Sequence, residues 1–189
     1  MSLEELLLLS AEADLDSRIE YGLTSSYGLS LSSPEPVTLH ELRLTDLAPE
    51  TLYHYRVISG TVTGRDHTFR TAVHETTPFR FAVLGDTQSN PLVVSVLSDA
   101  ILETNPDLVV HVGDEVGDGT DYDSWRTELF RPARELMYRV PVYVAIGNHE
   151  EDAPWFYYYH AYPDPENNYA FSYGNSFFVM ADTNGDVSP

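Results

Sequence analysis

Three short segments carry side chains that could hold metal ions: Gly85–Gln88, Gly113–Gly119 and Gly147–Glu150. Asp86, Gln88, Asp114 and Asn148 offer oxygen ligands and His149 offers an imidazole, a donor set that suits Mn, Fe or Zn. One carboxylate, Asp114, could reach two ions, and two ions about 3.5–4 Å apart form the clamp used for in-line attack on phosphorus. The alternative is three loop-capping acids and a surface histidine.

Each segment directly follows an apolar, β-rich run, at residues 79–84, 108–112 and 142–146. Such runs are typical of buried parallel strands, and residues that follow them gather at the carboxyl edge of a sheet. Apolar spacing predicts a helix over residues 92–104 and a second over 122–137, interrupted near Arg131-Pro132. Alternating strands and helices favour an α/β domain with parallel pairing, and Asp114 follows the central one of the three runs.

The order of these segments, GDTQ, GDEVGDG and GNHE, resembles the calcineurin-like metallophosphoesterases, most closely their purple-acid-phosphatase-type branch. The resemblance extends over about residues 79–184. It includes a helix and strand around 125–132 and 139–143 and a hairpin formed by 168–174 and 177–183.

The resemblance implies a two-metal centre that hydrolyses a small-molecule phosphate ester. Asp86 and Gln88 would serve the first ion, Asp114 would bridge, and Asn148 would serve the second, whereas His149 would face the substrate as a catalytic residue beside Asp114. Purple acid phosphatases have an iron-binding tyrosine where this chain has Gly117, which argues against a purple ferric centre. Many members of this family have histidine where this chain has Gln88, which either coordinates a hard cation and favours a Mn-type site or is a neighbour that binds no metal.

The family also supplies further histidines downstream, but no histidine follows His160 in this sequence. We therefore expect residues 79–189 to be the N-terminal part of a C-terminally truncated metallophosphoesterase domain, impaired in activity. An incomplete second sheet would expose an apolar strand edge around 177–180 and favour self-association.

Residues 1–73 have a different pattern, with short alternating runs at 17–21, 40–44, 52–59 and 67–70. Turn signals lie at Ser32–Pro36 and Gly60–Gly64. The spacing predicts an antiparallel all-β sandwich. The segment 44–53 resembles the tyrosine corner of fibronectin type III domains, with Tyr53 as the corner residue, and residues 74–78 are the expected linker.

The charge of the chain limits the kinds of partner that it could bind. The chain carries 30 acidic residues against 10 basic ones, all arginine, for a net charge of −20. That balance argues against nucleic-acid and anionic-membrane binding. No apolar run approaches a membrane span. Met1–Ser10 lacks the basic residues of a signal peptide, although the resemblance implies an extracellular or periplasmic protein. Cysteine is absent.

Two further features have competing interpretations. His111 lies inside an expected strand and is predicted to be a core residue rather than a ligand. The aromatic segment Trp155–Tyr159 could line a substrate pocket or simply pack, and packing is the commoner role. The sequence therefore predicts a metal-dependent phosphomonoesterase of the acid-phosphatase type. The alternatives are a non-catalytic module with a remnant half-site and a phosphodiesterase on the same scaffold.

Overall fold

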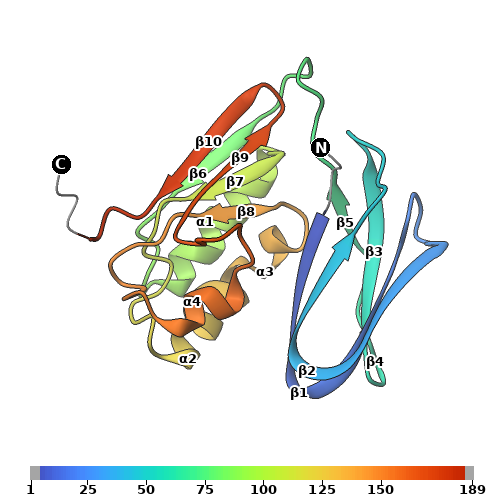
Figure 1. Ribbon diagram of the computed structural model, residues 1–189, viewed down its shortest axis with the longest axis horizontal. Coiled ribbons are helices and arrows are strands. Elements are labelled where there is room, and N and C mark those ends of the chain that lie inside the picture. The colour runs from blue at the N-terminus through green and yellow to red at the C-terminus, as the bar shows by residue number, and fades with distance from the viewer. Residues whose placement is uncertain (1–4, 186–189) are drawn as a thin grey trace. The chain divides into compact units, whose positions relative to one another are not determined.

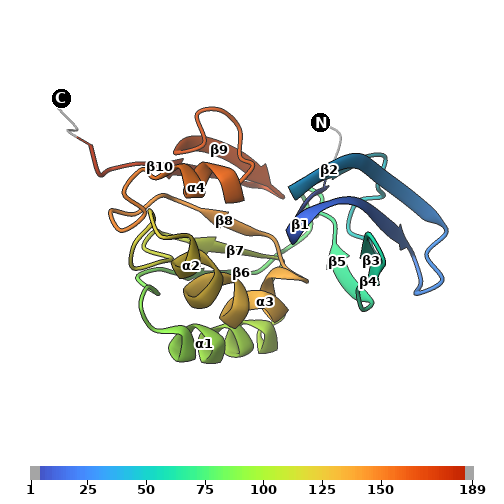
Figure 2. The same cartoon turned by 90° about the horizontal axis from the view of Figure 1, so that it is seen from below.

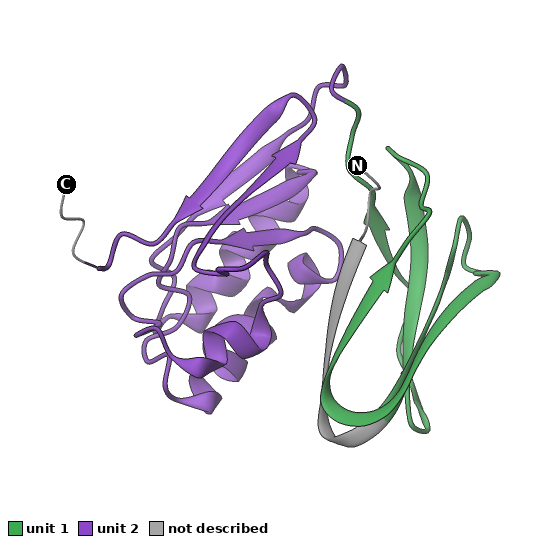
Figure 3. Cartoon of the chain, viewed as in Figure 1, with its two compact units in different colours: residues 1–74 green, residues 75–189 purple. Residues whose placement is uncertain are grey.

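The computed structural model describes the backbone of residues 5–185 and the side chains of residues 16–185. The chain divides into two compact units, residues 1–74 and 75–189 (Figure 3). None of the helices within residues 5–185 is both long and apolar enough to cross a membrane.

The first unit contains only strands in its described part: β1 (Glu5–Gly22), β2 (Leu29–Leu44), β3 (Leu52–Ser59), β4 (Val62–Thr63) and β5 (His67–Arg70). They form one antiparallel sheet in the order β2-β1-β3-β4, with β5 also paired to β3 (Figure 1). These strands are all-β, as predicted, but within the described residues they form one sheet, so the two-sheet sandwich stays a prediction. Its assignment to the fibronectin type III class stays a prediction.

The turn predicted at Ser32–Pro36 is wrong, because these residues lie within β2. The pairing of β1 with β2 shifts register there, from Leu15↔Val37 to Ser17↔Ser33. The prolines of this segment cannot donate to the ladder, so a bulge accommodates them without ending the strand.

Alternation along β3 places Tyr53 and Tyr55 in the core and leaves His54 and Arg56 half-buried on the other face, as predicted. The Tyr53 hydroxyl accepts a hydrogen bond from the Ala48 N–H at 3.0 Å, which is the contact expected of a tyrosine corner. The unit's core consists of Ile19, Leu42, Leu44, Leu47, Tyr53, Tyr55 and Phe69.

The second unit is built on three parallel strands, β6 (Phe81–Leu84), β7 (Leu108–His111) and β8 (Val142–Val144), in the order β6-β7-β8. Helix α1 (Pro91–Glu103) connects the first two, and its start is capped by the Asn90 side chain. The predicted parallel sheet, with the middle segment on its central strand, is confirmed.

The helical connection from β7 to β8 has three parts: α2 (Tyr122–Ser124), a π-helical segment (Trp125–Phe130) and α3 (Arg131–Met137). The predicted interruption near Arg131-Pro132 is therefore a π turn rather than a break. At its end the Arg131 N–H bonds to the Arg126 carbonyl, five residues back. Pro132 follows at the beginning of α3, where its missing N–H is tolerated.

The sheet lies between two layers (Figure 2). On one face it packs against α1 and α3, where Val109 contacts Leu136 and Val140. On the other face lies the hairpin of β9 (Asn168–Tyr173) and β10 (Ser176–Ala181), anchored by ring contacts such as Tyr143 with Phe171. The short helix α4 (Pro154–Tyr159) precedes the hairpin.

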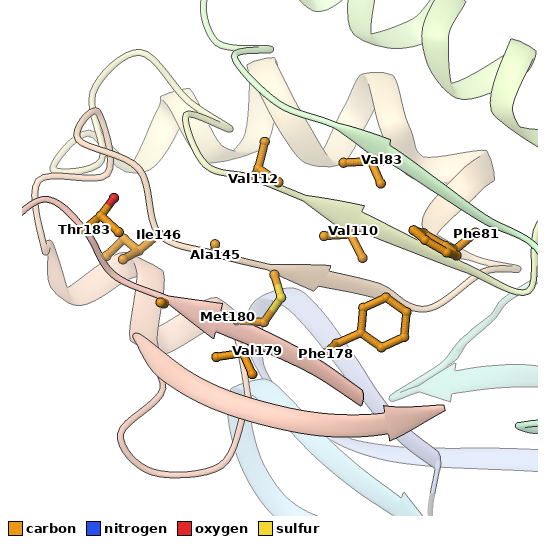
Figure 4. Close-up of a pocket in the computed structure, with 11 residues that line it drawn as sticks. Phe81, Val83, Val110, Val112, Ala145, Ile146, Phe178, Val179, Met180 and Thr183 are labelled. Carbon is orange, nitrogen blue, oxygen red and sulfur yellow. The ribbon is translucent and has the colours of Figure 1, made fainter. Parts of the chain in front are cut away.

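A cavity of about 450 Å³ separates the sheet from β10 (Figure 4). Phe81, Val110 and Val112 from the sheet side and Phe178 and Met180 from β10 line it. Apart from Thr183 the lining is apolar, and it includes none of the predicted ligands, so this cavity is distinct from the candidate metal centre.

Candidate metal centre

The five predicted site residues lie in three loops that leave the same edge of the sheet. The parallel register aligns Leu84, His111 and Val144 at the ends of the strands. The loops that follow hold Asp86 and Gln88, then Asp114, then Asn148 and His149. The predicted convergence of the three segments is therefore present in the fold.

Backbone and side-chain bonds gather on Asp114. The N–H groups of Thr87 and Gln88 donate to its main-chain carbonyl at 3.0 and 3.1 Å. The His149 N–H donates to its Oδ1 at 3.0 Å, and Gln88 Nε2 lies 3.5 Å from its Oδ2. Asp114 thus contacts both neighbouring loops, and one carboxylate oxygen is held by the backbone while the other faces Gln88.

Two of the predicted ligands adopt a left-handed backbone. Asp86 has φ of 52° and Asp114 has φ of 59°. Aspartate tolerates this region better than most residues, but it still costs about 1–3 kcal/mol, and such strain clusters at functional sites. The strain at both positions is consistent with loops shaped for ligand geometry rather than for stability.

The other candidate metal ligands, Asp86, Asn148 and Gln88, have side-chain oxygen atoms that could bind a cation. Asp86 and Asn148 are exposed, and neither side chain forms a hydrogen bond within the described residues. The Gln88 Oε1 is buried and likewise has no hydrogen-bond partner there. An orphaned carbonyl oxygen beside a carboxylate fits a bound hard cation, which would supply the missing partner.

Among the side chains of residues 16–185, no three histidine, aspartate or glutamate side chains lie close enough together to hold a metal ion. The reason is the donor set itself, because Asp86 and Asp114 are its only carboxylates and Gln88 and Asn148 contribute amides. The candidate ligands are therefore mostly oxygen atoms, from two carboxylates and two amides.

Glu150 is a site residue that the sequence reasoning did not single out. Its carboxylate is 0% exposed and accepts four backbone N–H groups. Oε1 lies 2.7 Å from the Glu115 nitrogen and 3.4 Å from that of Val116, and Oε2 lies 3.0 Å from the Asp114 nitrogen and 2.6 Å from that of Gly147. Burial, together with the nearby charge of Glu115, raises the pKa of Glu150 despite these bonds.

Glu115 forms a buried ion pair with His160, whose Nε2 lies 3.4 Å from its Oε2. Burial opposes ionisation of both groups, but the pair overcomes it: His160 lowers the pKa of Glu115, and Glu115 raises the pKa of His160. His160 Nδ1 also lies 2.8 Å from the Phe156 carbonyl oxygen. The pair thus ties the Asp114 loop to helix α4.

The π-helical segment contributes two more contacts to the loops. Glu128 Oε2 accepts the N–H groups of Ser89 at 2.6 Å and Gly117 at 2.8 Å, which joins the first loop to the second. The buried Trp125 donates its indole N–H to the Gly119 carbonyl at 3.0 Å. Glu115 and Glu150 adjoin motif residues in sequence, which is a usable signal, whereas nothing in the sequence distinguishes Glu128.

His111 and the aromatic segment behave as packing residues. His111 is buried, its Nε2 lies 2.9 Å from Thr87 Oγ1, and burial lowers its pKa. Within residues 154–159, Phe156 and Tyr159 are buried against Trp125. The prediction of a core role for His111 is confirmed, and the packing interpretation of these aromatic residues is favoured.

Comparison with known proteins gives consistent matches. Residues 79–186 match the family model described as calcineurin-like phosphoesterase. Purple acid phosphatase 15 of Arabidopsis thaliana is 27% identical over 182 residues, which cover 75% of this chain and 34% of that protein.

Two solved structures share the fold. The purple acid phosphatase PPD1 from yellow lupin (Lupinus luteus) seeds has a TM-score of 0.77 at 15% identity, covering 97% of this chain and 44% of its own. PhoD has a TM-score of 0.70 at 13% identity, covering 95% and 49%. This chain therefore spans between a third and a half of the relatives that it matches.

Proposed function

This chain belongs to the calcineurin-like phosphoesterase family, and from that premise we propose that its second unit provides part of the active site of a metal-dependent phosphomonoesterase. The observation that carries the proposal is the convergence of three loops on Asp114, with donors from Thr87 and Gln88 on one side and His149 on the other. A clamp for phosphoryl transfer uses two ions about 3.5–4 Å apart, and a carboxylate held between two neighbouring loops could be shared by both.

In this proposal Asp86 and Gln88 would hold a first ion, Asn148 would hold a second, and Asp114 would be shared between the two. The all-oxygen donor set and the orphaned Gln88 Oε1 favour hard divalent cations, with Mn²⁺ ahead of Zn²⁺ and Fe²⁺. When bound, the ions would polarise the phosphoryl group and lower the pKa of a coordinated water.

His149 acts on the substrate rather than on a metal. Its Nδ1 lies 3.0 Å from the Gly117 carbonyl oxygen, and because a carbonyl only accepts, Nδ1 carries the proton. Nε2 is then the ring nitrogen left to donate to a phosphoryl oxygen or to the leaving alkoxide. The same Gly117 bond raises the pKa of His149, which favours the protonated donor form.

Substrate, location and activity of the whole protein also belong to the proposal. Small-molecule phosphate esters are the substrates expected from the family, and an extracellular or periplasmic location is part of the same proposal. A second candidate is a non-catalytic module, favoured by the lack of a three-residue histidine or acid cluster among the described side chains of residues 16–185. A phosphodiesterase would use the same residues.

The deciding experiment counts bound metal per chain after incubation with Mn²⁺, Zn²⁺ or Fe²⁺, for wild type, Asp114→Asn and the exposed control Asp99→Asn. Asparagine tolerates the left-handed backbone at position 114, so the variant should remain folded. We expect uptake by wild type and Asp99→Asn and its loss in Asp114→Asn. Absence of uptake by wild type would favour the non-catalytic module.

Hydrolysis assays then separate the substrate classes. A p-nitrophenyl monoester and a bis-p-nitrophenyl diester, tested on the metal-loaded chain, distinguish phosphomonoesterase from phosphodiesterase activity. Faster turnover of the monoester is expected. Hydrolysis that is undiminished in Asp114→Asn would contradict the bridging role of that residue.

A further inference from the structure

A single buried oxygen atom joins two of the ligand loops. Glu150 Oε2 accepts the Asp114 N–H at 3.0 Å and the Gly147 N–H at 2.6 Å. One amide belongs to the proposed bridging ligand, and the other belongs to the residue before Asn148. The two loops follow different strands, β7 and β8, so this atom fixes their separation independently of the sheet.

The second oxygen of the same carboxylate secures the Asp114 loop. Oε1 accepts the Glu115 N–H at 2.7 Å and the Val116 N–H at 3.4 Å. A carboxylate has about four lone-pair positions, so four N–H groups fill it. The carboxylate is also fully buried, which leaves no oxygen for a metal, a substrate or solvent. All of the hydrogen-bonding capacity of the Glu150 carboxylate is therefore used by backbone N–H groups.

We propose that Glu150 is a positioning residue that sets the spacing between Asp114 and Asn148 and thereby the affinity of the centre for divalent cations. The proposal rests on the metal centre proposed above, but its structural part can be tested without metal. Groups that orient metal ligands from behind typically change metal affinity about 10- to 100-fold when they are mutated.

Two variants separate the effect of the length of the Glu150 side chain from the effect of its charge. Glu150→Gln keeps the length of the side chain but replaces one acceptor oxygen by an NH₂ group, which would face two backbone donors. Glu150→Asp keeps the charge but withdraws it by one methylene, too far to reach all four N–H groups. If Glu150 acted only by attracting cations, Glu150→Asp would bind metal as wild type does. A positioning role predicts that both variants are weakened.

Two controls match the variants in charge and in stability. Glu103→Gln removes one acidic charge at an exposed position on α1. Leu136→Ala opens the buried core under α3 without touching any of the three loops. If Glu150 is a positioning residue, its variants should bind metal more weakly than Leu136→Ala does. This should hold even when Leu136→Ala loses at least as much stability.

The first measurement is amide hydrogen exchange by NMR on the metal-free 189-residue chain. We expect Glu150→Gln to speed exchange at the amides of Asp114, Glu115 and Gly147 by about 10- to 100-fold, as loss of buried acceptors does. Leu136→Ala should not change these amides selectively. Unchanged exchange in Glu150→Gln would overturn the proposal.

The second measurement is the Mn²⁺ dissociation constant by calorimetry. We expect it to rise about 10- to 100-fold in Glu150→Gln and Glu150→Asp and to stay at the wild-type value in Glu103→Gln and Leu136→Ala. Wild-type affinity in Glu150→Asp, or equal weakening in Leu136→Ala, would overturn the positioning role. If wild type takes up no Mn²⁺, the proposed function loses its metal centre, whereas the hydrogen-exchange result still decides whether Glu150 holds the two loops together.

Discussion

Gly113 and Gly147 approach each other so closely that a Cβ added to Gly113 would lie 2.7 Å from the Gly147 Cα. Real Cβ atoms essentially never come this near to another heavy atom. Each glycine directly precedes a proposed ligand, Asp114 or Asn148. The absence of both side chains is therefore what lets the second and third loops meet.

Gly113→Ala should destabilise the second unit by about 2–5 kcal/mol, because it adds overpacking to a backbone with φ of 95°. Gly28→Ala is the matched control, since Gly28 has φ of 109° but open space around its Cα. Urea unfolding of both variants separates the two causes. Equal losses at the two positions would show that the close approach is unimportant.

His149→Asn should lower kcat for a phosphomonoester by about 10²- to 10⁴-fold, as loss of a general acid does. The asparagine amide can still donate to the Gly117 carbonyl, so the loop should keep its shape. Bound metal per chain should not change, because His149 is not a proposed ligand. The exposed His74→Asn is the control, and a loss of bound metal in His149→Asn would contradict the assignment.

The buried pair of Glu115 and His160 should give the second unit a window of maximal stability. The folded-state pKa of His160 is raised above 6.5, so its contribution is fully present below pH 6.5 and is lost as pH rises through the folded value. The pKa of Glu115 is lowered below 4.5, so its contribution is present above pH 4.5 and is lost as pH falls through the folded value.

Urea unfolding at a series of pH values tests this window. Wild type should lose stability as pH rises above 6.5, and Glu115→Gln should not show this decline, because its His160 has no carboxylate to keep it protonated. His54→Gln, which removes the exposed pair of His54 with Asp66, serves as the control. Identical pH profiles for wild type and Glu115→Gln would refute the pair's contribution.

Tyr53→Phe should cost the first unit about 1–2 kcal/mol, because it removes the acceptor of the Ala48 N–H. Tyr21→Phe is a suitable comparison, since Tyr21 packs against the same core and its hydroxyl has no hydrogen bond within the described residues. Unfolding followed by circular dichroism measures both. A similar loss of stability in the two variants would show that the hydrogen bond from Ala48 to the Tyr53 hydroxyl does not stabilise the unit.

Self-association through β10 remains a prediction. Within residues 5–185, β10 pairs only with β9, and its outer face presents Phe177 and Val179 without a charge. Val179→Lys should abolish any concentration-dependent association seen by sedimentation. Val96→Lys on α1 is the control at matched exposure, 68% against 67%. A wild-type chain that stays monomeric at high concentration would defeat the idea.

The sequence was sufficient for the scaffold of the second unit because strand and helix periodicities are local. The runs before Asp86, Asp114 and Asn148 became β6, β7 and β8 in the predicted parallel order. Their ligands share an edge because parallel strands end together. The same local information failed at Ser32–Pro36, where tertiary pairing carried a turn-like segment through β2 as a bulge.

The supporting groups could not be predicted, because their partners are backbone N–H groups from distant loops. No sequence pattern marks Glu128, and the position of Glu150 beside His149 does not reveal which backbone groups it contacts. Their role depends on contacts between loops that are far apart in the sequence. Glu150 and Asp114, for example, are separated by 36 residues. The Glu115 pairing with His160 likewise requires α4 to lie beside the second loop.

The aromatic cluster around Trp125 also gives the second unit an intrinsic tryptophan fluorescence signal. Both tryptophans of the sequence, Trp125 and Trp155, lie in the second unit, and their rings contact Tyr159. The first unit contains tyrosines but no tryptophan. Emission excited at the red edge, where tyrosine does not absorb, therefore comes from the phosphoesterase-family unit alone, so its melting can be followed in the intact chain without any label.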